Sequence, residues 1–252
     1  MSKSDMTGKA ALVTGAASGL GRAAAIKLAE VGANVCIVDM NEAGLDETAA
    51  LLSVSGGEVL IHATDLSDPD NCRPAVDAAV AKFGRLDALC NVAGIIKFSN
   101  SHETPRSDWD RTIAINLTAP FLLSQAAIPH LLETNGAIVN VASTAAFVGE
   151  AYVAAYCASK AGLVQMTKAM AMEYVRKPIR INAVAPGGMI TNIANDMTMP
   201  QGVEYDLIQR FSGLRGVVEV EDVADAILLL ASDAGRGYHG SCITIDAGIT
   251  AG

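Results

Sequence analysis

Two residues four positions apart, Tyr156 and Lys160, are the best candidates in this sequence for acid–base chemistry. They lie in a segment with a helical pattern, and side chains at this spacing share one face of a helix. A free phenol has a pKa of about 10 and is a poor base at neutral pH. A lysine ammonium about 4 Å away, at an effective dielectric constant of about 20, favours the phenolate by about 4 kcal/mol. We therefore expect Lys160 to lower the pKa of Tyr156, although a surface pair without any function fits the same spacing.

A glycine-rich segment, Thr14 to Gly21, reads TGAASGLG and follows a short apolar run. Its glycines permit a tight turn, a close approach of the backbone to a pyrophosphate, and close packing of a helix on a strand. The N-terminus of that helix would face the phosphates. An ordinary strand-to-helix turn is the alternative. The residues expected to bind a dinucleotide here are Gly15, Ser18, Gly19, Leu20 and Gly21.

The choice between the two nicotinamide dinucleotides is expected to depend on Asp39, which ends the second apolar run. A carboxylate at this position accepts hydrogen bonds from both hydroxyls of the adenine-side ribose, and it repels a 2′-phosphate. A basic side chain at Ser18 or Met40 could receive that phosphate, and neither residue is Lys or Arg. We therefore predict NAD rather than NADP. The alternative is that Asp39 merely caps the turn before Asn41.

Short apolar runs rich in β-branched residues alternate with segments of helical pattern along the chain. The runs are nearly continuous in apolar content, which is typical of strands buried on both faces of a parallel sheet. The alternation predicts an α/β fold, a doubly wound parallel β-sheet, in a single domain of residues 1–252. The expected strands are Ala10–Thr14, Asn34–Asp39, Val59–Ala63, Leu86–Val92, Ala137–Ala142, Ile179–Ala185 and Ser241–Ile245. The expected helices are Arg22–Val31, Glu42–Leu52, Pro69–Phe83, Trp109–Leu132, Tyr152–Val175 and Val220–Leu230.

The composition excludes several classes of protein. Of the 252 residues, 51% are hydrophobic and 18% are charged, which indicates a packed globule. The net charge of −9 is the wrong sign for binding nucleic acid. The five cysteines are scattered and accompany no cluster of histidines, so we expect reduced thiols and no metal site. A polar N-terminus and the lack of a long apolar run predict no secretion signal and no membrane span, hence a cytoplasmic protein.

Further motifs occur at the ends of the expected strands and between them. They are Asn91-Val92-Ala93-Gly94, Asn116 within Ile115-Asn116-Leu117, Ser143, and Pro186-Gly187. With the glycine loop and the Tyr156/Lys160 pair, their order and spacing resembles the short-chain dehydrogenase/reductases, single-domain oxidoreductases of the Rossmann fold, from Gly8 to Gly248. The sequence departs from the family pattern at Val92, where a second Asn is common, and at Ala247, where a glycine is.

The resemblance implies four catalytic residues. Tyr156 looks like the acid/base that takes a proton from an alcohol or returns it to a ketone. Ser143 would hold the substrate oxygen by a hydrogen bond. Lys160 would bind the nicotinamide ribose as well as act on Tyr156. Asn116 resembles the residue that positions a water next to Lys160 as a proton relay, although an Asn inside an apolar helix is as easily structural.

The resemblance also implies cofactor contacts from the adenine to the nicotinamide. Asp65 and Leu66 would flank the adenine, although Asp65 could equally be a turn residue. Beyond the glycine loop, the implied cofactor-binding residues are Asp39, Met40, Asp65, Leu66, Asn91, Ala93, Gly94, Tyr156, Lys160, Pro186, Gly187, Met189 and Thr191. The family pattern further implies a homotetramer or homodimer formed through the helices around Trp109–Leu132 and Tyr152–Val175.

The substrate is expected to be held by loops of the same domain, above all the irregular stretch of about 186–215. The side chains expected to line this site are mostly apolar: Ile95, Ile96, Ala145, Ala146, Phe147, Val148, Tyr152, Val153, Met189, Ile190, Ile193, Met197 and Met199. Such a pocket favours a cyclic or steroid-like secondary alcohol over a phosphorylated sugar, unless these residues only pack the loop.

Two other functions remain open. A 3-oxoacyl-thioester reductase of the same plan would more often prefer NADP, and Asp39 counts against it. A non-catalytic dinucleotide sensor or scaffold would be favoured by loss of Ser143, Tyr156 or Lys160, and all three are present. An enoyl reductase would be expected to show a longer spacing from Tyr to Lys.

Overall fold

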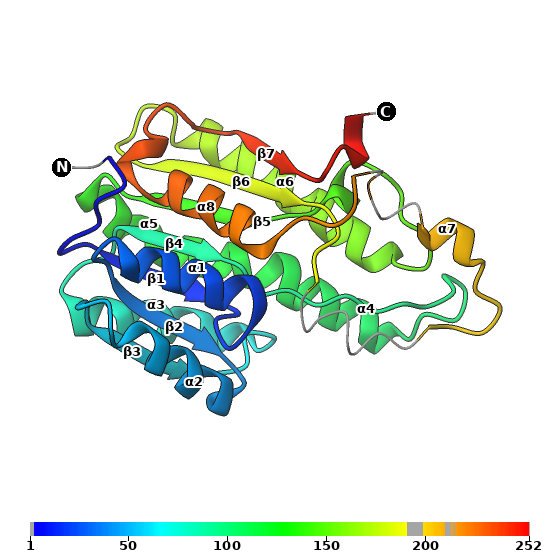
Figure 1. Cartoon of the computed structure of the whole chain (residues 1–252), viewed down its shortest axis with the longest axis horizontal. Coiled ribbons are helices and arrows are strands. Elements are labelled where there is room, and N and C mark those ends of the chain that lie inside the picture. The colour runs from blue at the N-terminus through cyan, green and yellow to red at the C-terminus, as the bar shows by residue number, and fades with distance from the viewer. Residues whose placement is uncertain (1–2, 191–198, 210–212, 214, 252) are drawn as a thin grey trace.

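The computed structural model of the protein describes residues 3–190, 199–209, 213 and 215–251. In this part of the chain one parallel sheet runs through the molecule, in the strand order β3-β2-β1-β4-β5-β6-β7 (Figure 1). Its strands are β1 (Ala10–Thr14), β2 (Asn34–Asp39), β3 (Val59–Ala63), β4 (Ala88–Asn91), β5 (Ala137–Val141), β6 (Arg180–Pro186) and β7 (Cys242–Ile245). The prediction of a doubly wound parallel sheet in a single domain is confirmed.

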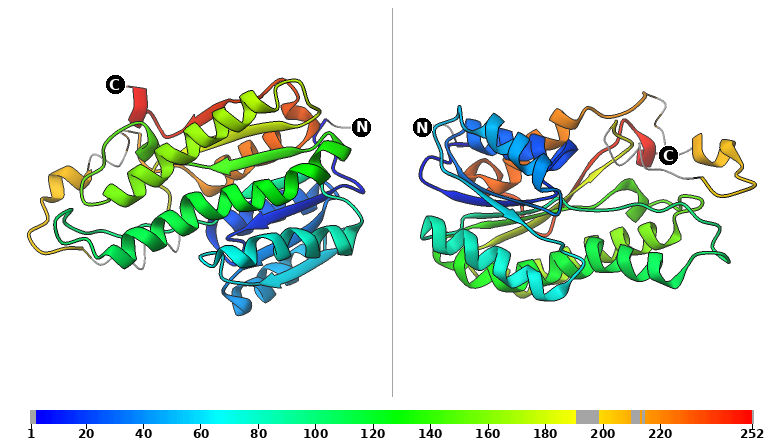
Figure 2. Two further views of the ribbon diagram at one scale, coloured as in Figure 1. Left: turned by 180° about the vertical axis from the view of Figure 1, so that it is seen from behind. Right: turned by 90° about the horizontal axis from the view of Figure 1, so that it is seen from below.

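Helices cover both faces of the sheet (Figure 2). One face carries α1 (Gly19–Glu30), α2 (Glu42–Leu52) and α8 (Val220–Ala231), and the other carries α3 (Cys72–Phe83), α5 (Ala119–Thr134) and α6 (Ala154–Glu173). In β1, Val13 packs in the first layer and Leu12 in the second, and neither side chain is exposed. Because both faces of each central strand are buried, the strands read as continuous apolar runs in the sequence.

The longest helix is continuous from residue 106 to 134. It consists of α4 (Arg106–Ile113), a π-helical turn (Ala114–Thr118) and α5. By length and composition this helix could cross a membrane, which differs from the sequence prediction. The prediction considered only unbroken apolar runs, whereas the helix also includes polar residues such as Asn116 and Ser124. More than half of its most apolar stretch, 56%, is buried inside the protein, where α5 packs in the same core as α3.

The carboxyl ends of the strands meet at one edge of the sheet, where ligands bind in open α/β folds. The chain winds outward from β1 through β2 to β3 and then crosses back to β4, on the other side of β1. This crossover opens a crevice between the loops that follow β1 and β4. Beyond the same edge, α7 (Tyr205–Gln209) projects from the body of the molecule (Figure 1). Of the expected substrate loop, the described parts are 186–190, 199–209, 213 and 215.

Candidate active site

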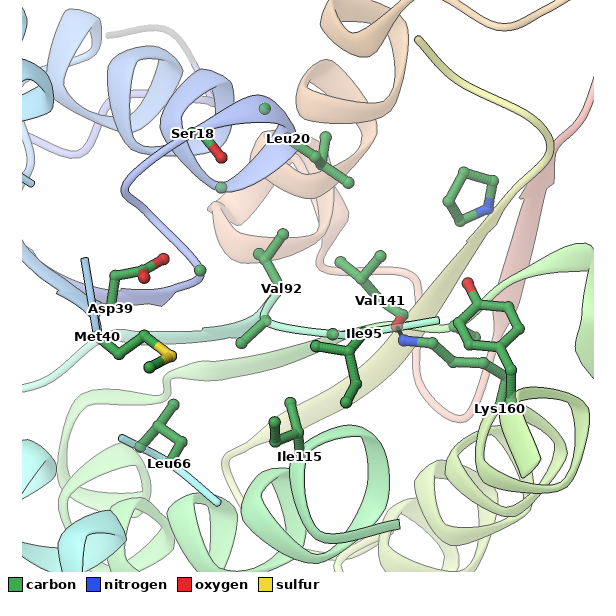
Figure 3. A pocket seen from close by; sticks show the side chains of 18 of the residues that line it. Ser18, Leu20, Asp39, Met40, Leu66, Val92, Ile95, Ile115, Val141 and Lys160 are labelled. Carbon is green, nitrogen blue, oxygen red and sulfur yellow. Dashed lines mark hydrogen bonds between the residues drawn. The ribbon is translucent and has the colours of Figure 1, made fainter. Parts of the chain in front are cut away.

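A single cleft collects most of the residues singled out in the sequence. It runs along the carboxyl ends of the strands, with Asp39, Met40 and Leu66 at one end and Lys160 at the other (Figure 3). Val92, Ile95 and Val141 lie between these ends, and Ser18 and Leu20 of the α1 start lie on one side (Figure 3). Among the cofactor-binding residues implied by the resemblance, the cleft is lined by Gly15, Ser18, Gly19, Leu20, Gly21, Asp39, Met40, Asp65, Leu66, Ala93, Gly94, Tyr156, Lys160, Pro186 and Met189.

The glycine loop lies where only glycine fits. Gly15 has φ +70°, and a Cβ added there would lie 2.9 Å from the Cα of Ala93. A Cβ at Gly21 would overlap the carbonyl oxygen of Gly15, so β1 and α1 could not approach as they do. α1 begins at Gly19, three residues earlier than expected, and Ser18 provides no side-chain cap for its first turn. The free N–H groups of that turn can therefore bind an anion in the cleft.

The glycine loop is held from behind by Arg22. The Arg22 guanidinium donates hydrogen bonds to the carbonyl oxygens of Ala17 and Gly44, to the hydroxyl of Thr48, and to the carboxylate of Glu47 at 2.7 Å. Because this cation already has four partners, it is committed to the scaffold of the loop rather than to the cleft.

Asp39 supports a turn of the backbone and also lines the cleft. One carboxylate oxygen accepts from the N–H of Ala17 at 3.2 Å, and the other accepts from the N–H of Asn41 at 3.0 Å. It therefore supports the turn before Asn41, while Asn41 itself caps α2. Each oxygen keeps a lone pair, and the residue lines the cleft, where a ribose hydroxyl can donate to it.

A second arginine, Arg111, lies beside Met40 and Asp65 at the Asp39 end of the cleft. The Arg111 guanidinium lies 4.0 Å from the Met40 sulfur, and it donates to the Ser67 hydroxyl at 3.2 Å and to Asp65 at 3.5 Å. The hydrogen bonds from Ser67, with Arg111, hold the pKa of Asp65 below its ordinary value. Asp65 is a turn residue, as the alternative reading had it, and it also forms part of the cleft wall.

At the other end of the cleft, Lys160 is almost completely buried. Its ammonium donates to the carbonyl oxygen of Val141 at 2.7 Å and lies 5.7 Å from the centre of the Tyr156 ring. Burial lowers the pKa of Lys160 to about 8. The two side chains share one face of α6, which gives the lysine a fixed position beneath the tyrosine.

The pKa of Tyr156 is raised to about 12, opposite to the direction expected from the sequence. Burial is the largest cause, and the charge of Glu150 adds to it, while the hydrogen bond with Ser143 works the other way. The expectation assumed a stabilising ammonium about 4 Å from the phenol and did not allow for the burial of the phenol, which raises its pKa. In the structure the Lys160 ammonium is directed to Val141, and its own charge is destabilised by burial.

Asn116 lies in the π-helical turn and is fully buried. Its side-chain oxygen accepts from the N–H of Ile95 at 2.8 Å, and its amide donates to the carbonyl oxygen of Ile95 at 2.9 Å and to the Ser159 hydroxyl at 3.1 Å. A Cβ at Gly94 would lie 3.3 Å from the Lys160 ammonium and 3.4 Å from the Asn116 oxygen. The side chain of Asn116 therefore fixes the loop after β4 against Lys160.

Two of the implied cofactor-binding residues that the structure describes, Asn91 and Gly187, do not line the cleft. Asn91 is buried, and its amide donates to Asn140 at 2.8 Å, so its side chain points into the core instead. Gly187 packs against β7, where a Cβ would lie 2.9 Å from the Cα of Asp246. Thr191 lies outside the described residues, as do Ile193 and Met197 of the expected substrate pocket.

The expected substrate-lining residues divide in a similar way. Ala145 and Val153 are buried in the protein, whereas Phe147, Val148 and Ile190 are exposed. The Tyr152 hydroxyl accepts from the N–H of Glu204 at 3.0 Å, which ties the segment before α7 to the start of α6.

The sequence reasoning missed several residues that line the cleft: Thr64, Val92, Ile115, Val141 and Ala142. Most of them end or follow a strand, and the carboxyl ends of parallel strands meet at one edge. Their position relative to the expected strands was therefore a usable signal. Ile115 instead lies next to Asn116 in the π-helical turn, which has no signal in the sequence.

The sequence defines the class of this protein. A family model described as enoyl-(acyl carrier protein) reductase matches residues 15–250. The chain belongs to the short-chain dehydrogenase/reductase family and is an oxidoreductase.

Among particular relatives, cis-4-hydroxycyclohexanecarboxylate dehydrogenase of Sinomonas cyclohexanicum is 40% identical over 245 residues, which cover 96% of this chain and 97% of that protein. The crystal structure of carveol dehydrogenase from Mycobacterium avium in complex with NAD has a TM-score of 0.88 and 28% identity, covering 98% of this chain and 99% of the other. The crystal structure of a putative 2-deoxy-d-gluconate 3-dehydrogenase from Agrobacterium tumefaciens with bound NADP has a TM-score of 0.85 and 34% identity, covering 100% of both chains. Similar folds therefore bind either dinucleotide.

Proposed function

We propose that this protein is an NAD-dependent dehydrogenase that interconverts a secondary alcohol and a ketone, with Tyr156 as the acid/base. The main support is that Tyr156 and the buried Lys160 ammonium, 5.7 Å from the centre of the Tyr156 ring, line the same cleft as Asp39. The glycine loop, with the free N–H groups of the first turn of α1 and no room for a Cβ at Gly15 or Gly21, fits a pyrophosphate.

A bound nicotinamide dinucleotide supplies the hydride donor or acceptor of this reaction. Ser143 holds the substrate oxygen, and its hydroxyl stabilises the charge that develops there. Tyr156 donates a proton to that oxygen when a ketone is reduced and accepts it when an alcohol is oxidised. With a pKa of about 12, the phenol is protonated at neutral pH, which is the form needed for ketone reduction.

Lys160 is proposed to bind the hydroxyls of the nicotinamide ribose. Its ammonium has three N–H donors, of which one is used by Val141. Asn116 is proposed to position the loop after β4. Its side-chain amide forms hydrogen bonds with the backbone of Ile95, which keeps Gly94 close to Lys160. Asn116 is also proposed to hold a water next to Lys160, through which protons pass between Tyr156 and the solvent.

The preference for NAD is proposed from Asp39. The carboxylate lies at the adenine end of the cleft and can accept from the ribose hydroxyls, whereas it repels a 2′-phosphate. Both nearby guanidinium groups, Arg22 and Arg111, have carboxylate partners of their own.

The substrate is proposed to be an apolar or cyclic secondary alcohol, held by the segment of about 186–215 in the single domain of residues 1–252. Ile95 and Met189, two of the residues expected around the substrate, line the cleft with apolar side chains, which suit such a molecule better than a phosphorylated sugar.

We also propose a homotetramer or homodimer in the cytoplasm. Trp109, Phe121 and Met172 lie exposed on the long helices that the family pattern uses for assembly. All five cysteines are free thiols, as expected in a reducing compartment. Light scattering at micromolar concentration tests the assembly, and a monomer would contradict it.

A screen of secondary alcohols with NAD and with NADP, followed by the absorbance of the reduced nicotinamide, tests the proposed function. The variant Tyr156→Phe is expected to lose at least about 100-fold in turnover while it still binds NADH. Tyr174→Phe is a matched control, because Tyr174 ends α6 away from the cleft. Retained turnover in Tyr156→Phe would contradict the role of the phenol.

The same screen separates the other functions. Activity confined to 3-oxoacyl thioesters with NADPH would indicate a thioester reductase. Binding of NADH with no turnover of any alcohol or ketone would instead indicate a sensor or scaffold.

A further inference from the structure

Ser159 is a fully buried polar residue that the proposed mechanism does not use. It lies on α6 directly before Lys160 and three positions after Tyr156. Its hydroxyl donates to the carbonyl oxygen of Tyr156 at 2.7 Å, a local bond that serines commonly form within helices. The same hydroxyl oxygen accepts from the side-chain amide of Asn116 at 3.1 Å. Only this second bond leaves α6, so local helix structure does not account for it.

The π-helical turn that carries Asn116 packs closely on α6. Gly162 lies on the facing side of α6, and a Cβ added there would lie 3.0 Å from the Leu117 side chain. That distance is tighter than an ordinary side-chain contact, so a glycine at this position lets the two helices approach. Turns of this kind often occur at functional sites. The close approach brings the Asn116 amide within hydrogen-bond distance of Ser159.

The hydrogen bonds of Asn116 fix the orientation of its amide. The Ser159 hydroxyl has one proton, which it donates to Tyr156, so it can only accept from Asn116. The amide hydrogens go to Ser159 and to the Ile95 carbonyl oxygen, and the amide oxygen accepts from the Ile95 N–H. Turning the amide over would bring donor against donor and acceptor against acceptor. The amide therefore has one favourable orientation.

This orientation places the amide oxygen beside Lys160. A Cβ added at Gly94 would lie 3.4 Å from the Asn116 oxygen and 3.3 Å from the Lys160 ammonium, so both atoms border the same small space. An oxygen there attracts the ammonium, whereas the amide hydrogens would repel it. Within the described residues the ammonium has one hydrogen-bond acceptor, the Val141 carbonyl oxygen. The oxygen of Asn116 is thus a second favourable neighbour.

We propose that Ser159 is a positioning residue, which holds the Asn116 amide with its oxygen towards Lys160 and so maintains the path by which protons leave the active site. The inference rests on the proposed function, in which an alcohol gives a hydride to the nicotinamide and a proton to Tyr156. That proton has to leave through the water proposed beside Lys160 before the next turnover. Without the Ser159 hydroxyl, one amide hydrogen of Asn116 loses its acceptor, and the amide is less firmly held.

The test compares Ser159→Ala with the wild type in the oxidation of cyclohexanol by NAD, or of the secondary alcohol that the wild type oxidises fastest. The variant is expected to lose about 10- to 100-fold in kcat, because misplacement of a positioned group by about 1 Å can cost about 100-fold. KM and the dissociation constant of NADH are expected to change less than about twofold, since Ser159 does not line the cleft. Imidazole at constant pH and ionic strength is expected to restore part of the lost kcat, because it carries protons in place of the impaired path.

Thr167→Val is a matched control on the same helix. The Thr167 hydroxyl is also buried, donates to the carbonyl oxygen of Leu163 at 2.7 Å and accepts from the Asn140 amide at 2.9 Å. It therefore has the same pair of hydrogen bonds as Ser159, and it does not line the cleft. Thr167→Val is expected to lose stability as Ser159→Ala does, while its kcat stays near the wild-type value and does not respond to imidazole.

Hydrogen exchange followed by mass spectrometry gives a readout that needs no cofactor. The backbone of the π-helical turn, Ala114–Thr118, is expected to exchange faster in Ser159→Ala than in the wild type, whereas Thr167→Val leaves this rate unchanged. If Ser159→Ala does not fold, Ser159→Cys decides the question in the same assays, because its thiol is similar in size and forms only weak hydrogen bonds.

A kcat of Ser159→Ala that equals the wild-type value, falls no further than in Thr167→Val, or shows no response to imidazole would overturn this inference and leave the proposed function standing. Unchanged hydrogen exchange in the π-helical turn would overturn it too. So would an equal loss in kcat and in NADH affinity, since Ser159 would then support the cleft as a whole. No turnover of any secondary alcohol by the wild type would overturn the proposed function, and the exchange comparison would then still test whether Ser159 holds the π-helical turn.

Discussion

The substitution Asp39→Asn removes one negative charge from the adenine end of the cleft and changes almost nothing in size. In the wild type, a 2′-phosphate beside Asp39 would bring together two anions about 5 Å apart at a partly exposed position. With an effective dielectric constant between about 20 and 80, the repulsion is about 1–3 kcal/mol per pair of unit charges. The carboxylate also strengthens its hydrogen bonds to the ribose hydroxyls of NAD by about 1 kcal/mol relative to a neutral acceptor.

The repulsion weakens the binding of NADPH, and the hydrogen bonds strengthen the binding of NADH. Their sum of about 2–4 kcal/mol therefore sets the ratio of the two dissociation constants. Asp39→Asn is therefore expected to shift the preference from NADH towards NADPH by about 30- to 1000-fold.

The assay measures the dissociation constants of NADH and NADPH at low and at high salt. Each cofactor is titrated into the protein, and binding is followed by the quenching of protein fluorescence or by calorimetry. Asp225→Asn is the control, since it removes the same charge from a surface ion pair with Lys27 between α8 and α1. Wild-type protein that binds NADPH as tightly as NADH, or an Asp39→Asn variant whose ratio stays within about threefold of the wild type, would refute the reasoning.

Two further predictions concern stability. Ala247 has φ +52°, in the left-handed region where an alanine is strained by about 1 kcal/mol, so Ala247→Gly is expected to leave the free energy of unfolding unchanged or raise it by up to about that amount. Urea unfolding measures this, and a loss of more than about 1 kcal/mol would contradict it. The second prediction follows from the pKa of Glu150, which is raised from 4.5 to about 7: the folded protein binds this proton more tightly than the unfolded chain does. The contribution of Glu150 to the free energy of unfolding, about 3 kcal/mol at most, is fully present below about pH 4.5. It is lost as the pH rises through about 7. Glu150→Gln is expected to lack this component when urea unfolding is compared at pH 5 and pH 8, and an unchanged pH dependence would contradict the raised pKa of this partly buried carboxylate.

The parallel sheet and its strands could be predicted because burial on both faces leaves continuous apolar runs, such as Ala10–Thr14, that the structure reproduces. Boundaries were less accurate where the ends are polar or glycine-rich. α1 begins within the glycine loop at Gly19 and not after it. Gly21 lies inside the helix, where the lack of a Cβ allows close contact with the backbone of Gly15 after β1.

The candidate site was predictable in position but not in orientation. Asn91 is in the expected place at the end of β4, yet its side chain points to Asn140, its register partner on β5. A motif gives the place of a residue in the chain, whereas its direction depends on the alternation of the strand and on partners far away in sequence. The expected lowering of the Tyr156 pKa was wrong for a related reason: the Lys160 ammonium donates to the carbonyl oxygen of Val141, which belongs to β5 and not to the helix that carries both side chains.

The strand order has a consequence for how the protein is made. β1 pairs with β2 on one side and with β4 on the other, so the first strand synthesised cannot be fully paired until β4 has left the ribosome. The half of the chain that is made first carries the glycine loop, Asp39 and Asp65, and the half made later carries Ser143, Tyr156 and Lys160. The residues proposed to bind the adenosine part of the dinucleotide are therefore synthesised well before the residues proposed to act in catalysis. The late, non-local pairing of β1 with β4 also makes slow assembly the expectation for this chain, and a dinucleotide bound across both halves would brace that pairing once it forms.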